Sequence, residues 1–273
     1  MAEYWNGRPA CVWVAEAERF DSMLAPFGRL LLAAVALEPG EGVLDVGCGN
    51  GAVSLEAARA VGSGGHVTGL DLSAPMLSLA RRRSEELGVD VDFVQGDAQT
   101  ASFDRPFDVV VSRFGMMFFD DPEAAFSNLA TAVRPGGRMC FVCWQEMFAN
   151  EWIAVPATAM VAHVGIPELP EPGAPGPFSL ADADRTKSLL DSAGWSEVTV
   201  EERKEKMRMG GRDPEDVVAF MLSDEIGRRL VEGKDSEAVK AGTDATVEAL
   251  RPYVVSDGVA LGGAYWLVTA RKA

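Results

Sequence analysis

The chain has 273 residues, of which 48% are apolar, and a formal net charge of −16. This length suffices for one large α/β domain or two small ones, and the negative charge disfavours nucleic acid and anionic membranes as partners, because both need clustered cations. The longest apolar run, 30–37, is too short to cross a bilayer. The polar amino terminus lacks a basic-then-apolar leader, so we expect a cytoplasmic protein without membrane insertion.

Residues 1–40 are expected to form an N-terminal helical segment. Phe27, Leu30, Leu31, Ala34 and Val35 recur at the spacing of one helix face. We expect this helix to pack over a sheet or over the mouth of a ligand site.

From residue 41 onward, short β-branched runs alternate with helical segments, which is typical of βαβ units and a parallel sheet. Helices are expected to begin at Ser73 with Pro75, and at Asp121 with Pro122, because these are capping pairs. The second of these helices should end at RPGG, 134–137. This core, 41–145, holds five expected strands, at 42–47, 66–72, 91–97, 107–114 and 136–144.

After residue 145 the alternation breaks. Residues 146–166 look helical, and five prolines between 167 and 177 then predict a stiff surface connection. A helix at 181–195 and a strand at 196–209 follow, then a helical stretch that opens at Asp213 and Pro214, and a last strand at 262–273. We expect a single domain, 1–273, with helical cap insertions at 146–178 and 210–257 and with closing helix and strands at 179–209 and 258–273.

Four cysteines, Cys11, Cys48, Cys140 and Cys143, are too few and too scattered for a disulfide framework. Cys140 and Cys143 have CxxC spacing, but they lie in an expected strand, where side chains three apart point to opposite faces. We interpret both as small core residues, and we predict no metal site.

The segment VLDVGCGNG, 43–51, places three glycines after the first strand, at the edge of the sheet where ligands bind. Such a turn alone could also hold a dinucleotide. Asp45 argues against this, because a carboxylate would repel a pyrophosphate and attract an ammonium and a sulfonium. Asp71 ends the second strand, where an acid binds ribose hydroxyls, and Asp97 ends the third, within reach of an adenine amino group. S-adenosylmethionine satisfies all three acids.

These segments together resemble the class I S-adenosylmethionine-dependent methyltransferases, most of all their ubiquinone/menaquinone-type small-molecule branch. VLDVGCGNG resembles the family's glycine-rich motif, GLDLSAPML its ribose-binding strand end, VQGDAQ its adenine-binding turn, and 107–144 its fourth and fifth strands. The resemblance implies a doubly wound, Rossmann-like α/β fold. Its seven-stranded sheet would have the order 3-2-1-4-5-7-6 with the last strand antiparallel, and the helical insertions would form a substrate cap.

The resemblance also implies contacts with the cofactor. Asp45 would reach the methionine amino group through water, Asp71 would hold the ribose, and Asp97 would take the adenine edge. The full set is Asp45, Gly47, Cys48, Gly49, Asp71, Leu72, Met76, Gly96, Asp97, Ala98, Ser112 and Arg113. Three alternatives stay open: Asp97 as a helix cap, Asp71 as a mere cap, and Leu72 and Met76 as ordinary core residues.

The acceptor is expected to be an apolar or aromatic small molecule. Residues 112–119 read SRFGMMFF, without the Asn/Asp-Pro-Pro-aromatic motif of family members that methylate nucleobase or amide nitrogens. This departure argues against nucleic acid or glutamine as substrate. The predicted acceptor pocket consists of Tyr4, Trp5, Phe114, Met117 and Trp144.

The sequence assigns no general base. His163 in the first insertion is a weak candidate, Glu146 and Tyr253 are weaker, and His66 at the start of a strand is interpreted as structural. The choice among O-, N- and C-methylation stays open, as does a homo-oligomeric state. Two rival functions also stay open: a protein that binds S-adenosylmethionine without turnover and, less favoured, a nicotinamide-dependent dehydrogenase, which Asp45 and GxGxG in place of GxGxxG disfavour.

Overall fold

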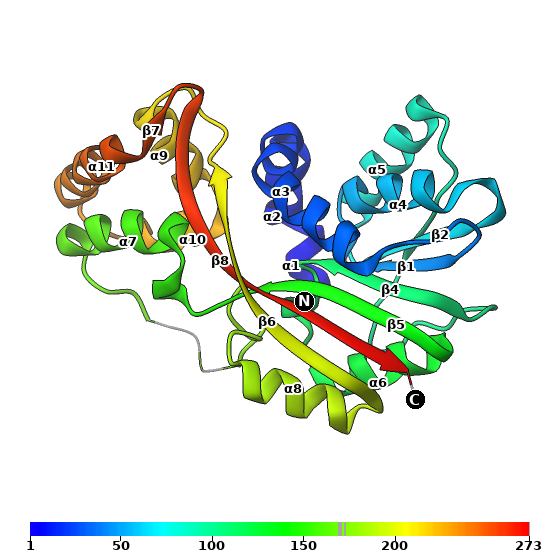
Figure 1. Ribbon diagram of the computed structural model, residues 1–273. Coiled ribbons are helices and arrows are strands. Elements are labelled where there is room, and N and C mark those ends of the chain that lie inside the picture. Colours follow the sequence, from blue (N-terminus) through cyan, green and yellow to red (C-terminus); the bar gives the residue numbers. More distant parts are fainter. Residues whose placement is uncertain (169–170, 172, 273) are drawn as a thin grey trace.

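A computed structural model describes residues 1–168, 171 and 173–272. Its central sheet has the strand order β3-β2-β1-β4-β5-β8-β6, and the short strand β7 pairs with β8 off this path (Figure 1). Strand β8 runs antiparallel to both β5 and β6, so the expected 3-2-1-4-5-7-6 order is confirmed, with β7 as a small addition. The strands are β1 Gly42–Val46, β2 His66–Asp71, β3 Asp92–Gln95, β4 Phe107–Arg113, β5 Val133–Trp144, β6 Trp195–Arg208, β7 Val254–Val255 and β8 Gly258–Lys272.

Helices cover both faces of this sheet (Figure 1). All five residues of β1 are buried, as expected for a central parallel strand covered on both faces. The helices on one face are α3 Ala17–Val35, α4 Ala52–Val61 and α5 Ala74–Leu87, and those on the other are α6 Pro122–Ala132 and α8 Ala183–Ser192.

The expected helix caps form as the local sequence predicts. Ser73 Oγ accepts from the Met76 N–H (3.4 Å), Asp121 Oδ1 from Ala124 (3.0 Å) and Asp213 Oδ1 from Asp216 (2.9 Å). Helix α6 ends at Ala132, just before the RPGG segment, and RPGG itself lies inside β5, which begins at Val133 rather than at 136. The register between β4 and β5 shifts there, so the turn becomes an irregular start of the strand.

The C-terminal half adds a helical cap to the sheet. Strands β6 and β8 extend past the sheet into this cap, on the left of Figure 1. The cap contains α7 Glu151–Val164, α9 Pro214–Ser223, α10 Glu225–Val231 and α11 Ser236–Leu250, and α7 packs along α11. The first cap insertion, expected at 146–178, includes residues 169, 170 and 172, and the last strand, expected at 262–273, includes residue 273; these four positions lie outside the described residues.

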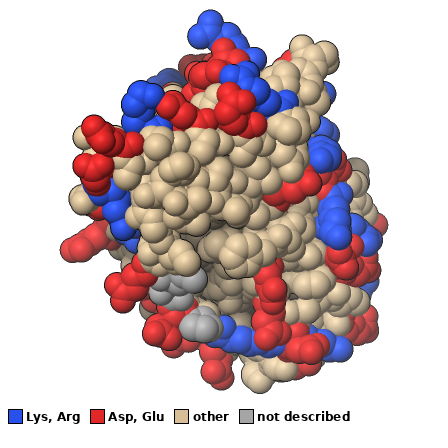
Figure 2. Space-filling view, turned by 90° about the vertical axis from the view of Figure 1, so that its left-hand side faces the viewer, with Lys and Arg blue, Asp and Glu red and all other residues tan. Residues whose placement is uncertain are grey.

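The outer side of the cap carries a broad area without charged side chains, bordered by a mixture of acidic and basic residues (Figure 2). No helix within residues 1–168, 171 and 173–272 has both the length and the apolar character needed to span a membrane.

Two short helices, α1 Ala2–Asn6 and α2 Arg8–Ala15, precede α3. Asn6 fastens them to the end of β2, because its Nδ2 donates to Leu72 O (2.9 Å) and its Oδ1 accepts from the Ala74 N–H (3.0 Å). In α3, Phe27, Leu31 and Val35 are buried as expected, whereas Leu30 and Ala34 are exposed. The buried face of α3 is therefore narrower than expected. It continues toward the amino terminus through Leu24, Met23 and Phe20.

Two smaller features complete the fold. Cys140 and Cys143 are both buried in β5 and free of disulfides, which agrees with their interpretation as core residues. Single 3-10 turns occur at Gly62–Gly64, Met116–Phe118, Met147–Ala149 and Arg251–Tyr253.

Candidate functional site

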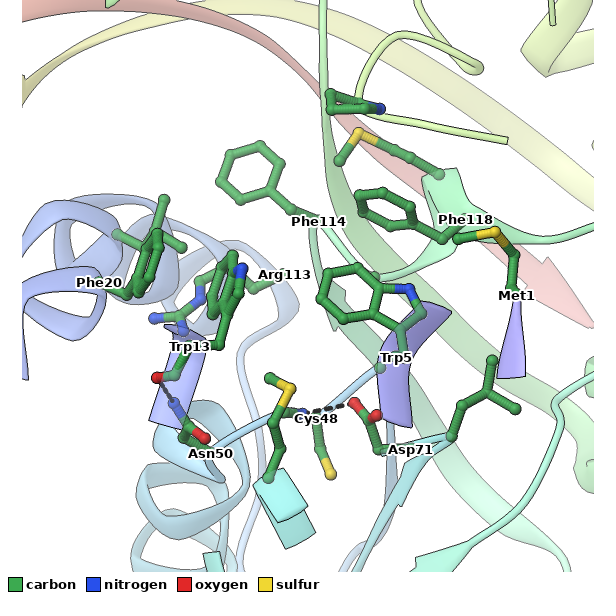
Figure 3. Close-up of a pocket in the computed structure, with 18 of the residues that line it drawn as sticks. Met1, Trp5, Trp13, Phe20, Cys48, Asn50, Asp71, Arg113, Phe114 and Phe118 are labelled. Carbon is green, nitrogen blue, oxygen red and sulfur yellow. Dashed lines mark hydrogen bonds between the residues drawn. The ribbon is translucent and has the colours of Figure 1, made fainter. Parts of the chain in front are cut away.

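A cavity of about 270 Å³ lies at the carboxyl ends of β1, β2 and β4. Helices α1 and α2 close it from the amino terminus, and α9 and α10 from the cap. In Figure 3, Trp13 and Phe20 lie on one side of the cavity, Trp5 and Phe118 lie on the other, and Asp71 and Cys48 lie below these rings. The predicted cofactor residues that line the cavity are Gly47, Cys48, Gly49, Asp71, Leu72, Met76, Gly96, Asp97, Ala98 and Arg113.

The backbone N–H groups of the glycine loop after β1 donate hydrogen bonds within the protein. The N–H groups of Gly47 and Cys48 donate to Leu70 O (2.8 and 3.1 Å), and that of Gly49 donates to Asp71 Oδ2 (2.8 Å). Gly47 has φ +66°, and a Cβ there would lie 2.7 Å from Gly115 Cα, so only glycine fits. A phosphate-binding loop points such N–H groups at its ligand. Here these three N–H groups already donate to acceptors within the protein.

Asp71 is held rigidly at the end of β2. Its Oδ1 accepts from the Ser73 N–H (2.8 Å) and its Oδ2 from the Gly49 N–H (2.8 Å, dashed in Figure 3). Burial raises the pKa of Asp71, against the effect of these backbone hydrogen bonds. Each carboxylate oxygen can accept a second hydrogen bond, so the group is oriented to receive hydroxyl donors from a ligand in the cavity.

Asp97 lies after β3 and stabilises a turn rather than a helix. Its Oδ1 accepts from the Gln99 N–H (2.9 Å), and the Gln99 Nε2 donates to both of its oxygens (2.9 and 2.8 Å). Gln99 Oε1 in turn accepts from the Asp121 N–H (2.6 Å). The helix-cap alternative is therefore wrong, and Asp97 lines the cavity in a fixed orientation.

The placement expected for Asp45, facing the loop, is wrong. Asp45 is 1% exposed, does not line the cavity, and accepts a hydrogen bond from Ser54 Oγ (2.5 Å) in the first turn of α4. Burial raises its pKa to about 7, although the Ser54 hydrogen bond and the Arg113 charge act in the other direction. Side chains alternate along a strand, and Asp45 falls on the face that α4 covers, so it ties the loop to this helix.

Arg113 lines the cavity, whereas Ser112 does not. Ser112 is fully buried, and its Oγ accepts from the Gly115 N–H (3.2 Å), so it shapes the turn after β4. The Arg113 guanidinium lies 3.9 Å from the Asp21 carboxylate, which also pairs with Arg83 (2.7 Å). The positive charge in the cavity wall is thereby balanced within the protein.

Residues 43–137 match a family described as a methyltransferase domain. The chain is 37% identical over 118 residues to aklanonic acid methyltransferase DauC of Streptomyces sp. strain C5, covering 42% of this chain and 54% of that protein. It is 39% identical over 116 residues to nocamycin O-methyltransferase of Saccharothrix syringae, covering 42% and 41%. The chain thus spans about half or less of the length of the curated relatives that it matches.

A solved structure, geranyl diphosphate C-methyltransferase of Streptomyces coelicolor A3(2), has the same fold with a TM-score of 0.53. It is 18% identical, with 91% of this chain and 76% of that chain covered. Residues 43–137 form a methyltransferase domain of the class I, S-adenosylmethionine-dependent family.

The predicted acceptor residues Tyr4, Trp5, Phe114, Met117 and Trp144 all line the cavity. The Phe114 ring stacks on Trp144 with 3.9 Å between centroids and 14° between planes. Phe114 has φ +63°, which is unusual for a bulky residue and marks local strain directly beside the cavity. The Met117 sulfur accepts from the Trp144 N–H (3.4 Å), which fixes the segment after β4 against β5.

The weak candidates for a general base lie elsewhere. His163 is exposed on α7, Glu146 is exposed before that helix, and neither lines the cavity. Tyr253 lines a separate surface groove. His66 starts β2 beside the Phe107 ring (5.6 Å), and burial lowers its pKa, in keeping with a structural role. No group of three or more His, Cys, Asp or Glu side chains in the described ranges is placed to hold a metal ion.

Several lining residues were missed by the sequence reasoning. Asn50 pins the loop to α2, because its Nδ2 donates to Trp13 O (3.0 Å; Figure 3). The helix periodicity, if followed back from Phe27, would have found Phe20. The cap residues carry no local signal, because they reach the cavity only through tertiary packing. The missed residues include Phe20, Asp21, Asn50, Gln99, Met207, Met209, Phe220, Met221, Asp224 and Ile226.

Proposed function

We propose that the protein transfers a methyl group from S-adenosylmethionine to an apolar or aromatic small molecule. One observation carries the proposal: the N–H groups of Gly47, Cys48 and Gly49 donate to Leu70 O and Asp71, so the cavity meets the Asp71 carboxylate here and not these three N–H donors. A dinucleotide pyrophosphate would need those donors. An adenosine with a cationic tail needs the carboxylate.

The lining fits each part of this cofactor. Asp71 would accept the ribose hydroxyls, and Asp97 with Ala98 would face the adenine edge, with Leu72 and Met76 packed against the ring. The glycine loop and the Asp21–Arg113 pair would surround the methionine part, where both charges of an amino acid meet a partner. When bound, the cofactor supplies an electrophilic methyl group on a positively charged sulfur.

The rest of the cavity suits an uncharged acceptor. Phe20, Phe114, Trp144 and Met221 form apolar walls that exclude water and hold the acceptor in line, and such positioning can lower the barrier by several kcal/mol. On the side of the molecule shown in Figure 2, Lys and Arg alternate with Asp and Glu and do not gather into a patch, which supports a small molecule over nucleic acid. The names of the two curated relatives favour a small, oxygen-bearing acceptor.

Calorimetry with S-adenosylmethionine, S-adenosylhomocysteine and NADH tests the cofactor. Binding of the first two without NADH supports the proposal, and binding of NADH alone overturns it. Transfer from methyl-labelled S-adenosylmethionine to a panel of hydroxylated aromatic compounds then tests the activity. Cofactor binding without transfer to any acceptor would instead favour the binding protein without turnover.

A further inference from the structure

The cavity wall includes a carboxylate from the cap, Asp224, at the N-terminal cap of α10. A second, smaller apolar cavity of about 60 Å³ lies inside the cap between α7, α9, α10 and α11. Trp152, Met221, Asp224 and Ile226 line both cavities. Asp224 therefore lies where the two apolar spaces adjoin.

Asp224 differs from Asp21 and Asp120, the two ion-paired carboxylates of the cavity wall, and it comes from the cap, unlike Asp71 and Asp97. Asp21 pairs with Arg83, and Asp120 pairs with the amino group of Met1 (2.9 Å). Asp224 has no ion pair with any residue in 1–168, 171 or 173–272. Its Oδ1 accepts from the Gly227 N–H (2.8 Å), which caps α10 and fixes the side chain. The carboxyl keeps free lone pairs beside the acceptor space.

We propose that Asp224 is the general base of the reaction and that the acceptor is an acidic hydroxyl compound, a phenol or an enol, held between the apolar walls. This inference rests on the proposed function. The acceptor oxygen bonds to the methyl carbon while the sulfur–carbon bond breaks and its electron pair goes to sulfur. The hydroxyl proton passes to the Asp224 carboxylate. A carboxylate is a base suited to an acidic hydroxyl, whereas an aliphatic alcohol holds its proton too strongly.

The electrostatic surroundings agree with this role. Burial raises the pKa of Asp224 to about 6, with Glu225 adding to the rise and the backbone N–H groups of Gly227 and Ile226 opposing it. Tyr4 of α1 is a titratable group that faces this region; burial, then Glu225 and Asp224, raise its pKa, and Arg229 acts in the other direction. Glu225 is itself neutralised by Arg228 and Arg229. The lining residues from α7 and α9, Trp152 and Met221, do not titrate. Asp224 is thus ionised at neutral pH and close to the pKa that suits a base.

Asp224→Asn separates the base from the helix cap, because Asn caps a helix as well as Asp does. Asp235→Asn is the matched control, since Asp235 caps α11 in the same insertion through the N–H groups of Glu237 and Ala238 (both 3.0 Å) and is exposed. The binding probes are 2-naphthol and its methyl ether, 2-methoxynaphthalene, titrated into protein saturated with S-adenosylhomocysteine.

We expect the wild type and Asp235→Asn to bind 2-naphthol about tenfold more tightly than the ether, because only the hydroxyl can donate to the carboxylate. In Asp224→Asn this preference should vanish, since the amide N–H can donate to the ether oxygen. The kcat for methylation of 2-naphthol should fall about 100-fold. Wild-type kcat/KM should rise with pH through about 6, and this rise should be absent in Asp224→Asn.

Three results would overturn the inference: an unchanged preference in Asp224→Asn, failure of 2-naphthol to bind the wild type, or tighter binding of 2-naphthylamine than of 2-naphthol. The last would make the space an amine site. The two proposals fail separately, because loss of S-adenosylmethionine binding by the wild type would remove the proposed function, whereas intact cofactor binding with a failed naphthol test removes only the role of Asp224.

Discussion

The two ends of the cavity are built in different ways. At the cofactor end, Asp71 is fixed by backbone N–H groups from the neighbouring loop and from its own turn, Gly49 and Ser73. At the acceptor end, Trp152 and Met221 come from separate cap helices and meet only because α7, α9 and α10 pack together. Methionine side chains adapt to the shape of what they contact. The fold can therefore hold one cofactor constant while the cap determines the acceptor.

The largest effect should come from the rigid end. In Asp71→Asn, the side-chain NH2 group would face the backbone N–H of either Gly49 or Ser73, so that one hydrogen bond is lost. The negative charge that orients the ribose is lost as well. We expect the affinity for S-adenosylmethionine to fall about 100-fold, as for the loss of hydrogen bonds to a charged group. Calorimetry measures the change, and Asp92→Asn, an exposed carboxylate at the start of β3, is the control. A change of twofold or less would mean that Asp71 does not hold the cofactor.

The same contrast explains what the sequence could predict. Strand ends, glycine turns and helix caps depend on a few adjacent residues, so the sequence correctly predicts the caps at Ser73 and Asp121 and the cavity positions of Gly47 and Asp71. The strand order was implied by the family resemblance and is confirmed.

The wrong predictions concern residues whose position depends on a contact distant in the sequence, or on which face of a strand or helix the side chain occupies. Asp45 has the right position for the loop, but its side chain falls on the face that Ser54 of α4 covers. His163 lies in the cap, which made it a candidate for the general base, but its position on α7 leaves it exposed to solvent. Asp224 reaches the cavity only because α10 packs near α1 and α7, a contact that no local pattern encodes.

Asp45 should make the cofactor end less stable at neutral pH. Its pKa is about 7 in the folded state against an ordinary value of 3.8, so the folded protein keeps a proton that the unfolded chain releases between these values. Stability from this residue is therefore lost as the pH rises from about 4 to 7. Asn cannot ionise but can still accept from Ser54, so the free energy of unfolding of Asp45→Asn, relative to wild type, should increase by about 2 kcal/mol between pH 5 and pH 8.

Urea unfolding of both proteins at the two pH values measures this difference, and Asp92→Asn again serves as the control. A constant gap between wild type and Asp45→Asn would show that Asp45 stays ionised when folded, so that burial does not dominate its environment.

The smallest effect should come from a change at the acceptor end. It tests most directly whether the two ends of the cavity act independently. Met221→Ala removes an apolar wall from both cavities, so the affinity for 2-naphthol should fall about fivefold, as expected for about 1 kcal/mol of lost apolar contact. The affinity for S-adenosylmethionine should not change, because the cofactor end is held by its own hydrogen bonds. Met147→Ala, outside both cavities, is the matched control. Titration of each variant with both ligands decides the matter: an equal loss of both affinities in Met221→Ala would mean that the two ends form one unit, and that the cap does not determine the acceptor independently of the cofactor.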